Sequence, residues 1–214
     1  MSRRHRAESF IRQDTGCVIN EKEEETMKAL RIISLLIVLA LSVIAFAEEA
    51  PAAVNLLVNP SFEETQDPGL NEGDTFPGWT YETDAESWSV LFSDGPAYAG
   101  DLAGATWCAD PFNFSVIQTI AIEAAGTYTA SAWIALGEAT FGDAELRIVA
   151  EDGTVVASAA LPAVEANTNT EYQNIVIEEF ALEAGTYQFV VFVPCTAVGN
   201  NSFFRVDDAF LGLK

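Results

Sequence analysis

Little in this chain could carry out acid–base or metal-assisted catalysis. The sequence of 214 residues contains one histidine, His5, which lies in a charged N-terminal stretch. Without other histidines, His-based triads, most catalytic zinc sites and the commonest general base are excluded. No glycine-rich phosphate-binding motif leads from a strand into a helix. Paired carboxylates could hydrolyse glycosidic bonds, but no pair stands out among the 32 acidic residues. The sequence therefore predicts a binding protein and not an enzyme.

The elements that must position any binding residues are β-strands. Runs of β-branched and aromatic residues alternate with polar ones and are separated by glycine-containing turns. No helical stripe of useful length follows residue 47. After a short leader at 48–54, this pattern predicts an all-β fold over residues 55–214, a two-sheet antiparallel sandwich or jelly roll. The expected strands cover residues 116–122, 128–136, 145–150, 154–159, 174–179 and 186–193.

Two of the expected strands begin with the same tetrapeptide. Ala-Gly-Thr-Tyr ends at Tyr128 and again at Tyr187. Side chains alternate across a strand, so each tyrosine shares its face with every second residue that follows. These faces are apolar and should point to the core. Trp133 and Phe192 stand at the same offset from their tyrosines, and both should point outward.

The N-terminal part of the chain predicts export. Residues 27–47 combine a positively charged start, an apolar run and the small-x-small site Ala45-Phe-Ala47, as in a secretory signal. The apolar run is shorter than the roughly 20 residues that a membrane-spanning helix needs. We interpret residues 1–26 as an extension upstream of the true start, and Glu48 as the first mature residue. The alternative for the apolar run is a buried core helix.

The charge of the mature chain limits its partners. Seven of the ten basic and six of the 32 acidic residues precede residue 48, which leaves three basic and 26 acidic residues and a formal charge of −23. Such a surface repels phosphate backbones and anionic membranes, so nucleic acid and membrane insertion are not expected. It is compatible with neutral glycans and divalent cations, or simply with solubility in a salty medium. We expect a monomer that is secreted, extracellular or at the cell surface.

Two cysteines remain after the expected cleavage site. Cys108 and Cys195 would be exposed to an oxidising environment in an exported chain. A disulfide between them would close a loop of almost ninety residues. In the chain-entropy model it would stabilise the fold by roughly 4–5 kcal/mol. The alternative is two buried thiols.

Three short motifs resemble a known family. They are the opening Asn55-Leu-Leu-Val-Asn-Pro-Ser-Phe-Glu63, the later Pro77-Gly-Trp79 and the closing Arg205-Val-Asp-Asp-Ala-Phe-Leu211. In order and placement they resemble the galactose-binding-like jelly rolls, and among these the carbohydrate-binding modules of the family 4/9/22 kind. The resemblance covers nearly the whole mature chain. It implies first and last strands that lie side by side, a core position for Trp79, and a structural calcium where the chain ends meet.

The resemblance also implies which residues hold the calcium. Glu63 and Asp207 match the positions whose carboxylates bind this ion, with Asp208 as a weaker third candidate. Backbone carbonyls and water would supply the other oxygen ligands, of which calcium takes six to eight. The alternative for Glu63 is an ordinary exposed acid.

The glycan platform that the resemblance implies should consist of aromatic rings. Sugar rings present apolar C–H faces that stack on aromatic side chains, while amides and carboxylates bind the hydroxyls. Trp133 is the leading candidate because it should point outward, with Phe192 and Gln188 beside it. The further candidates are Trp88, Trp107 and Tyr98, with Tyr81 and Phe112 as other expected loop positions. Any of these aromatic residues could instead pack in the core, and the site could lie on a sheet face or at a loop end.

The predicted function is therefore that of a secreted, non-catalytic carbohydrate-binding module that binds a polysaccharide or other glycan and contains a structural calcium. The alternative is a surface or extracellular-matrix protein, structural or adhesive, that uses the same sandwich to bind protein. A glycan site should place amides and acids beside the rings. A protein-binding site should form a flat apolar patch instead.

Overall fold

The computed structural model describes Thr26, Lys28 and residues 53–65, 76–85, 90–107, 111–137, 140–161, 171–197 and 203–214. The chain divides into two units, Met1–Pro51 and Ala52–Lys214. In the first unit Thr26 and Lys28 are helical, and the predicted signal segment otherwise lies outside the described residues. Among the described residues, no helix has the length and apolar character needed to cross a membrane.

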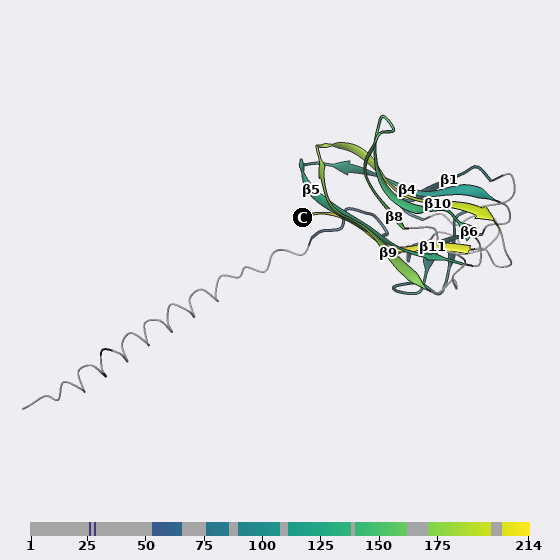
Figure 1. The fold of residues 1–214 in the computed structure, drawn as a ribbon, viewed down its shortest axis with the longest axis horizontal. Coiled ribbons are helices and arrows are strands. Elements are labelled where there is room, and N and C mark those ends of the chain that lie inside the picture. The colour runs from purple at the N-terminus through teal and green to yellow at the C-terminus, as the bar shows by residue number, and fades with distance from the viewer. Residues whose placement is uncertain are drawn as a thin grey trace, which may run out of the picture. The chain divides into compact units, whose positions relative to one another are not determined.

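The second unit is built from two antiparallel sheets (Figure 1). Sheet A has the strand order β1-β4-β10-β7-β8, with β6 also pairing with β10, and sheet B has the order β2-β3-β11-β5-β9. The bounds are β1 Thr80–Thr83, β2 Phe92–Asp94, β3 Ala103–Trp107, β4 Phe112–Ile122, β5 Gly126–Leu136, β6 Thr140–Phe141, β7 Ala144–Ala150, β8 Val155–Leu161, β9 Tyr172–Leu182, β10 Gly185–Ala197 and β11 Phe203–Leu213. The predicted two-sheet antiparallel sandwich is confirmed.

Strand alternation places the core as the sequence predicts. In β5, Ala130, Ala132 and Ile134 are fully buried, and in β10, Phe189 and Val191 are fully buried. Both faces follow from a repeat of two residues, because every second side chain enters the space between the sheets. The core position of Trp79 is also confirmed: it is 5% exposed, and its ring stacks on Phe62 at 4.8 Å between centroids.

The resemblance implies that a first strand lies beside the last strand, but the opening motif, Asn55–Glu63, does not form a strand. It nevertheless runs beside the last strand, because the Leu56 amide donates to the Leu211 carbonyl at 2.8 Å. The Asn55 side chain adds two bonds to β11, since its Nδ2 donates to the Ala209 carbonyl and its Oδ1 accepts from the Leu211 amide. On the other side, the buried Gln118 side chain binds both backbone groups of Val58. Side chains thus replace part of a strand ladder where the two ends of the domain meet.

Candidate functional site

The outward side of sheet B carries aromatic and charged residues in register. In β11, Phe204 and Val206 belong to the core, so Phe203, Arg205 and Asp207 lie on the opposite face. Residues paired across an antiparallel sheet share a face. The outward partners can therefore be read from the strand register, and we call this surface the outer face of sheet B.

One row of this outer face crosses all five strands. It runs from Phe92 in β2 through Ala105, Arg205 and Ala135 to Tyr172 in β9. Two further rows flank it. On one side Trp107 pairs with Phe203, and on the other side Trp133 pairs with both Asp207 and Asn174.

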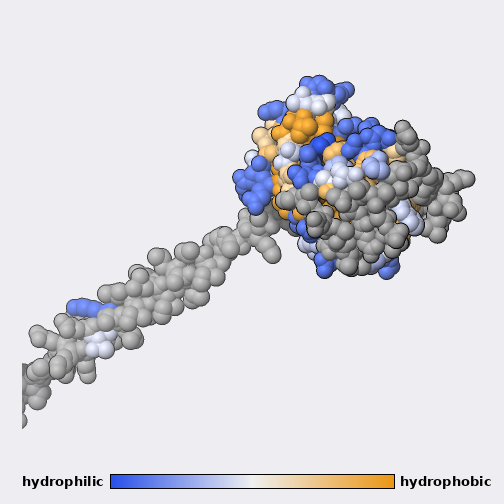
Figure 2. All heavy atoms as spheres, turned by 45° about the vertical axis from the view of Figure 1, so that its right-hand side comes forward, coloured by the Kyte–Doolittle hydropathy of each residue, from blue (hydrophilic) through white to orange (hydrophobic). Residues whose placement is uncertain are grey.

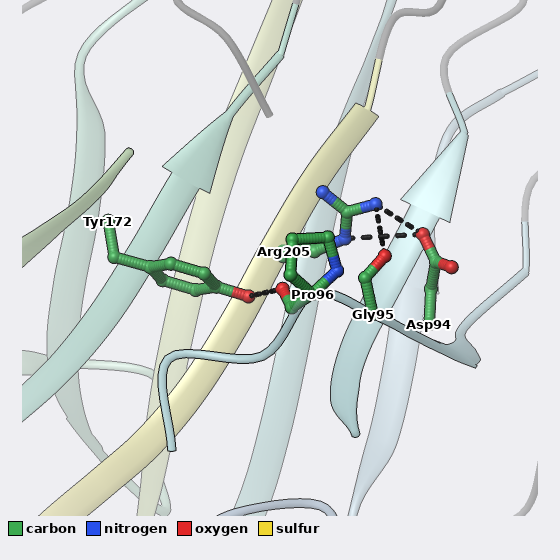
Figure 3. A network of polar contacts seen from close by, with 5 residues as sticks. All are labelled: Asp94, Gly95, Pro96, Tyr172 and Arg205. Carbon is green, nitrogen blue, oxygen red and sulfur yellow. Dashed lines mark hydrogen bonds and ion pairs between the residues drawn. The ribbon is translucent and has the colours of Figure 1, made fainter. Parts of the chain in front are cut away.

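The β2–β3 loop, residues 95–102, is bonded to this face (Figure 3). The guanidinium of Arg205, a residue that is only 5% exposed, donates from Nη2 to Asp94 Oδ2 at 2.5 Å and to the Gly95 carbonyl at 2.9 Å. The Tyr172 hydroxyl donates to the Pro96 carbonyl at 3.0 Å. A buried charge is costly unless it is paired and hydrogen-bonded, and Arg205 meets both conditions. The network therefore holds the loop on the sheet.

Aromatic rings line both sides of the Arg205 network. Tyr98, from the loop, stacks on Trp133 with 3.8 Å between centroids and 13° between planes, and it also contacts Tyr172 at 5.8 Å. Trp107 lies against Phe203 at 4.9 Å. Tyr98 and Trp107 are each 43% exposed. The rings therefore combine a supported side with a side that is open to solvent.

Two carboxylates hold the same loop through its backbone. Asp207 Oδ2 accepts hydrogen bonds from the amides of Tyr98 at 2.7 Å and Ala99 at 2.9 Å. Glu63 Oε1 accepts from the amides of Asp101 at 2.8 Å and Leu102 at 2.9 Å. The predicted calcium ligands thus come from distant parts of the chain to one five-residue segment.

Asp207 is a strongly perturbed acid. It is fully buried, and burial raises its pKa to about 6 although the amides of Ala99, Asp208 and Tyr98 oppose the shift; the charge of Asp208 raises it further. Burial, with a contribution from Asp207, also raises the pKa of Tyr172. Ionisation of Asp207 is therefore less favourable in the folded protein than for an aspartate in water.

The predicted calcium site offers carboxylate oxygens, which calcium prefers, but only a few of them. Among the described residues, no group of three His, Cys, Asp or Glu side chains could hold a metal ion. Asp208 is exposed and has a positive φ of 42°, at the irregularity in β11. A cation held by Glu63 and Asp207 would have to take its other ligands from backbone carbonyls and water.

The structure brings together some of the predicted glycan-binding residues and separates others. Trp133, Tyr98 and Trp107 gather on the outer face of sheet B. Phe192 and Gln188 do not, because β10 belongs to sheet A whereas β5 belongs to sheet B. The two outward directions are therefore opposite, and a single platform of Trp133, Phe192 and Gln188 is wrong.

Phe192 and the expected loop positions have other surroundings. Phe192 packs against the Arg147 guanidinium, 4.1 Å from its ring centroid. Phe112 is buried in β4 and Tyr81 stacks on Phe114 from β1, so neither is a loop residue. Trp88 lies outside the described residues.

The predicted disulfide remains a prediction because Cys108 lies outside the described residues. Cys195 is buried and pairs with Phe112 across β10 and β4. The strand that follows Cys108 is therefore a direct neighbour of the strand that carries Cys195, which makes the predicted disulfide feasible.

Sequence reasoning missed Arg205, Phe203, Tyr172 and Asp94 as members of the site. Alternation in the closing motif could have placed Phe203 and Arg205 beside Asp207, opposite the core face. Nothing in the sequence pairs Tyr172 or Asp94 with them, since only the strand register does so.

Comparison with solved structures places this fold among known proteins. The module TmCBM61, solved in complex with β-1,4-galactotriose, matches at a TM-score of 0.56 and 21% identity over 76% of this chain and 100% of its own. The structure described as Family 16 Carbohydrate Binding Module-2 matches at 0.50 and 17% identity, over 73% and 99%. The chain has the jelly-roll fold of carbohydrate-binding modules. No family model and no curated protein matches the sequence.

The same sandwich also occurs within larger chains. The enzymatically active domain of bacteriophage CBA120 tailspike protein 4 matches at a TM-score of 0.53 and 13% identity, over 75% of this chain and 22% of its own. The arabinose-bound MgGH51 α-L-arabinofuranosidase matches at 0.52 and 12% identity, over 78% and 27%. At these identities the likeness concerns the fold, so function must be argued from the site.

Proposed function

We propose that this protein is a secreted, non-catalytic module that binds a neutral glycan on the outer face of sheet B. The observation that carries the proposal is the pair of half-open rings, Tyr98 and Trp107, on one face. Each is backed by a second ring, Trp133 or Phe203, that fixes its orientation. Supported rings of this kind suit stacking on the apolar faces of sugar rings.

Polar groups beside the rings favour a glycan over a protein partner. Arg205, Asp94 and the Tyr172 hydroxyl lie between the two aromatic pairs and bond to one another or to the loop, whereas Asn174 is exposed and pairs with Trp133 in the strand register. An exposed amide beside a ring suits sugar hydroxyls, whereas a flat protein-binding patch would be apolar throughout. Binding without turnover is expected, so incubation with a bound glycan should release no reducing sugar.

Charge favours a neutral glycan over an acidic one. Each of the three basic residues after residue 47 is already in an ion pair: Arg147 with Glu145, Arg205 with Asp94, and Lys214 with Glu179. A uronate or sulfate group would therefore meet a chain with a formal charge of −23 after residue 47 and would have to compete for a paired cation.

Titration of the exported protein with a neutral galactan and with an acidic polysaccharide tests this proposal. Trp107→Ala and Tyr98→Ala should each weaken neutral-glycan binding several-fold, since an aromatic stacking contact is worth about 1 kcal/mol. Phe192→Ala, a matched ring removal on sheet A, should leave binding unchanged. Loss of binding in Phe192→Ala alone would move the site to sheet A, and preference for the acidic polysaccharide would contradict the charge argument.

The calcium is part of the proposal. The ion would bind Glu63 and Asp207 and stabilise the segment Tyr98–Leu102, which both carboxylates hold through its amides. An ion that binds the folded state alone raises stability by about 2.7 kcal/mol at a hundredfold excess over its dissociation constant.

Export and the disulfide can be tested together by mass spectrometry of the secreted protein. We expect an N-terminus at Glu48 and a mass two hydrogens below that of the reduced chain, from a bridge between Cys108 and Cys195. Alkylation of both thiols without prior reduction would rule the bridge out.

A further inference from the structure

One strand edge of the sandwich lacks the features that usually keep sheet edges apart. The strand order of sheet A ends at β1 and β8, and that of sheet B at β2 and β9. Strands β1 and β2 have four and three residues, and β9 carries Glu178 and Glu179. Short strands and charged side chains protect an edge from pairing with another chain.

Strand β8 has neither form of protection. Its seven residues, Val-Val-Ala-Ser-Ala-Ala-Leu, include no charge, proline or glycine. In the part of the chain that the structure describes, its ladder partner is β7, on one side. An apolar, uncharged edge of this length is a template for a further strand.

The free edge belongs to an ordered strand. Ala157, Ala159 and Leu161 pack against the core, while Val155 is 48% and Val156 43% exposed. The β7–β8 hairpin forms the top of the domain in Figure 1, and at the top of Figure 2 an apolar area lies just below a hydrophilic tip. The strand therefore offers a fixed backbone with apolar side chains at the surface.

In place of the monomer expected from the sequence, we propose that β8 pairs antiparallel with β8 of a second copy, which forms a two-fold symmetric dimer with a continuous sheet. The strand is its own complement when the axis passes through Ser158. Val155 then lies opposite Leu161, Val156 opposite Ala160, and Ala157 opposite Ala159. Each pair shares a face, and small residues surround the axis, so the backbones can approach to hydrogen-bonding distance.

Charge selects β8 as the place where two copies can meet. After residue 47 each copy carries a formal charge of −23, so two copies repel each other and a contact surface without acidic side chains is favoured. Pairing through β8 places no like charges directly opposite each other. The remaining repulsion acts at longer range, and salt screens it over about 10 Å at 0.1 M. The dimer should therefore strengthen as salt is added, unlike an interface built on ion pairs.

Sedimentation velocity of the secreted protein over a range of concentrations, at low and high salt, tests the proposal. We expect a monomer–dimer equilibrium that shifts toward dimer with salt. Ser158→Lys places two lysines opposite each other at the axis and should weaken dimerisation by at least about fivefold, which corresponds to roughly 1 kcal/mol. If Ser158→Lys lowers the melting temperature, Ala160→Lys takes its place as the test variant. It should also weaken dimerisation.

The matched control is Val176→Lys, a change of the same charge at a 41% exposed position on the β9 edge. It should leave dimerisation unchanged or strengthen it, because it reduces net repulsion. A monomer at all concentrations and salt levels would overturn the proposal, as would lysine variants of β8 that dimerise normally. Loss of the dimer in Val176→Lys alone would assign the interface to β9. Glycan titration of the β8 variants is independent of this result, because β8 belongs to sheet A and the proposed glycan site to sheet B.

Discussion

The buried carboxylate of Asp207 should make stability depend on pH in a direction that calcium reverses. Its pKa is about 6 in the folded protein, against 3.8 for an unperturbed aspartate. Between these values the folded state binds more protons than the unfolded state. The free energy of unfolding contributed by this group is therefore fully present below pH 4 and falls as the pH rises toward and through 6.

The size of the effect follows from the two pKa values. At 1.36 kcal/mol per pH unit, the difference between 3.8 and about 6 corresponds to at most about 3 kcal/mol. For a domain of this size, 1 kcal/mol shifts the melting temperature by about 2–4 °C. Ionisation of Asp207 should therefore lower the melting temperature by up to roughly 6–12 °C when no cation is present.

Calcium at the proposed site would change the sign, because a cation favours the ionised carboxylate. The pKa of Asp207 then falls, and protons compete with the ion at low pH. Stabilisation by calcium should be greatest near pH 7 and should decline as the pH is lowered through the range where the carboxylate becomes protonated.

Melting curves from pH 4 to pH 7.5, in chelator and in excess calcium, measure both effects. Asp207→Asn is neutral throughout, so the wild-type melting temperature relative to this variant should fall with rising pH in chelator and recover with calcium at pH 7. Glu123→Gln, at an exposed turn acid, controls for the loss of one surface charge. A pH-independent difference in chelator would refute the raised pKa, and equal calcium responses in wild type and Asp207→Asn would exclude Asp207 as a ligand.

Two further pairs of substitutions test how the β2–β3 loop is held. At Gly100, which has a φ of 78°, an added Cβ would lie within 2.2 Å of Glu63 Oε1, whereas at Gly153, with a φ of 84°, nothing lies within 4 Å. Gly153→Ala should cost about 1–2 kcal/mol from backbone strain, and Gly100→Ala clearly more, in denaturant unfolding; equal costs would contradict the contact. Arg205→Met leaves Asp94 without its partner and should cost up to about 3–5 kcal/mol, less to the extent that water reaches Asp94. Additive effects of Arg205→Met and Asp94→Ala would show that the ion pair contributes nothing.

Alternation predicted the faces of the strands but not the sheets to which they belong. Residues such as Ala132 and Val191 were expected to be buried because every second side chain of a strand in a sandwich points into the core. Which strand pairs with which depends on contacts between distant segments. The repeated Ala-Gly-Thr-Tyr therefore fixed the outward direction of Trp133 and Phe192, yet left open that they lie on opposite sides of the sandwich.

Strand β3 shows why part of the site gave no sequence signal. Four of its five residues, Ala103 to Thr106, are buried, so burial does not alternate along the strand. One face of β3 meets the core, and the other contributes Ala105 to the row that contains Arg205. A strand that is covered on both faces lacks the alternation of apolar and polar residues. Its place in the site can be assigned only when the side chains that cover it are known.

The attachment of the β2–β3 loop has a consequence for binding. Arg205, Tyr172, Asp207 and Glu63 hold the backbone of this loop by hydrogen bonds, from Gly95 to Leu102. The Tyr98 ring is therefore placed on Trp133 before any ligand arrives. Ordering a mobile aromatic side chain on binding would cost about 0.5–1.5 kcal/mol, comparable to what one stacking contact supplies. If the outer face of sheet B binds a glycan as we propose, the loop bonds spare the complex this cost at Tyr98, so weakening the loop should reduce affinity even when both exposed rings remain in the sequence.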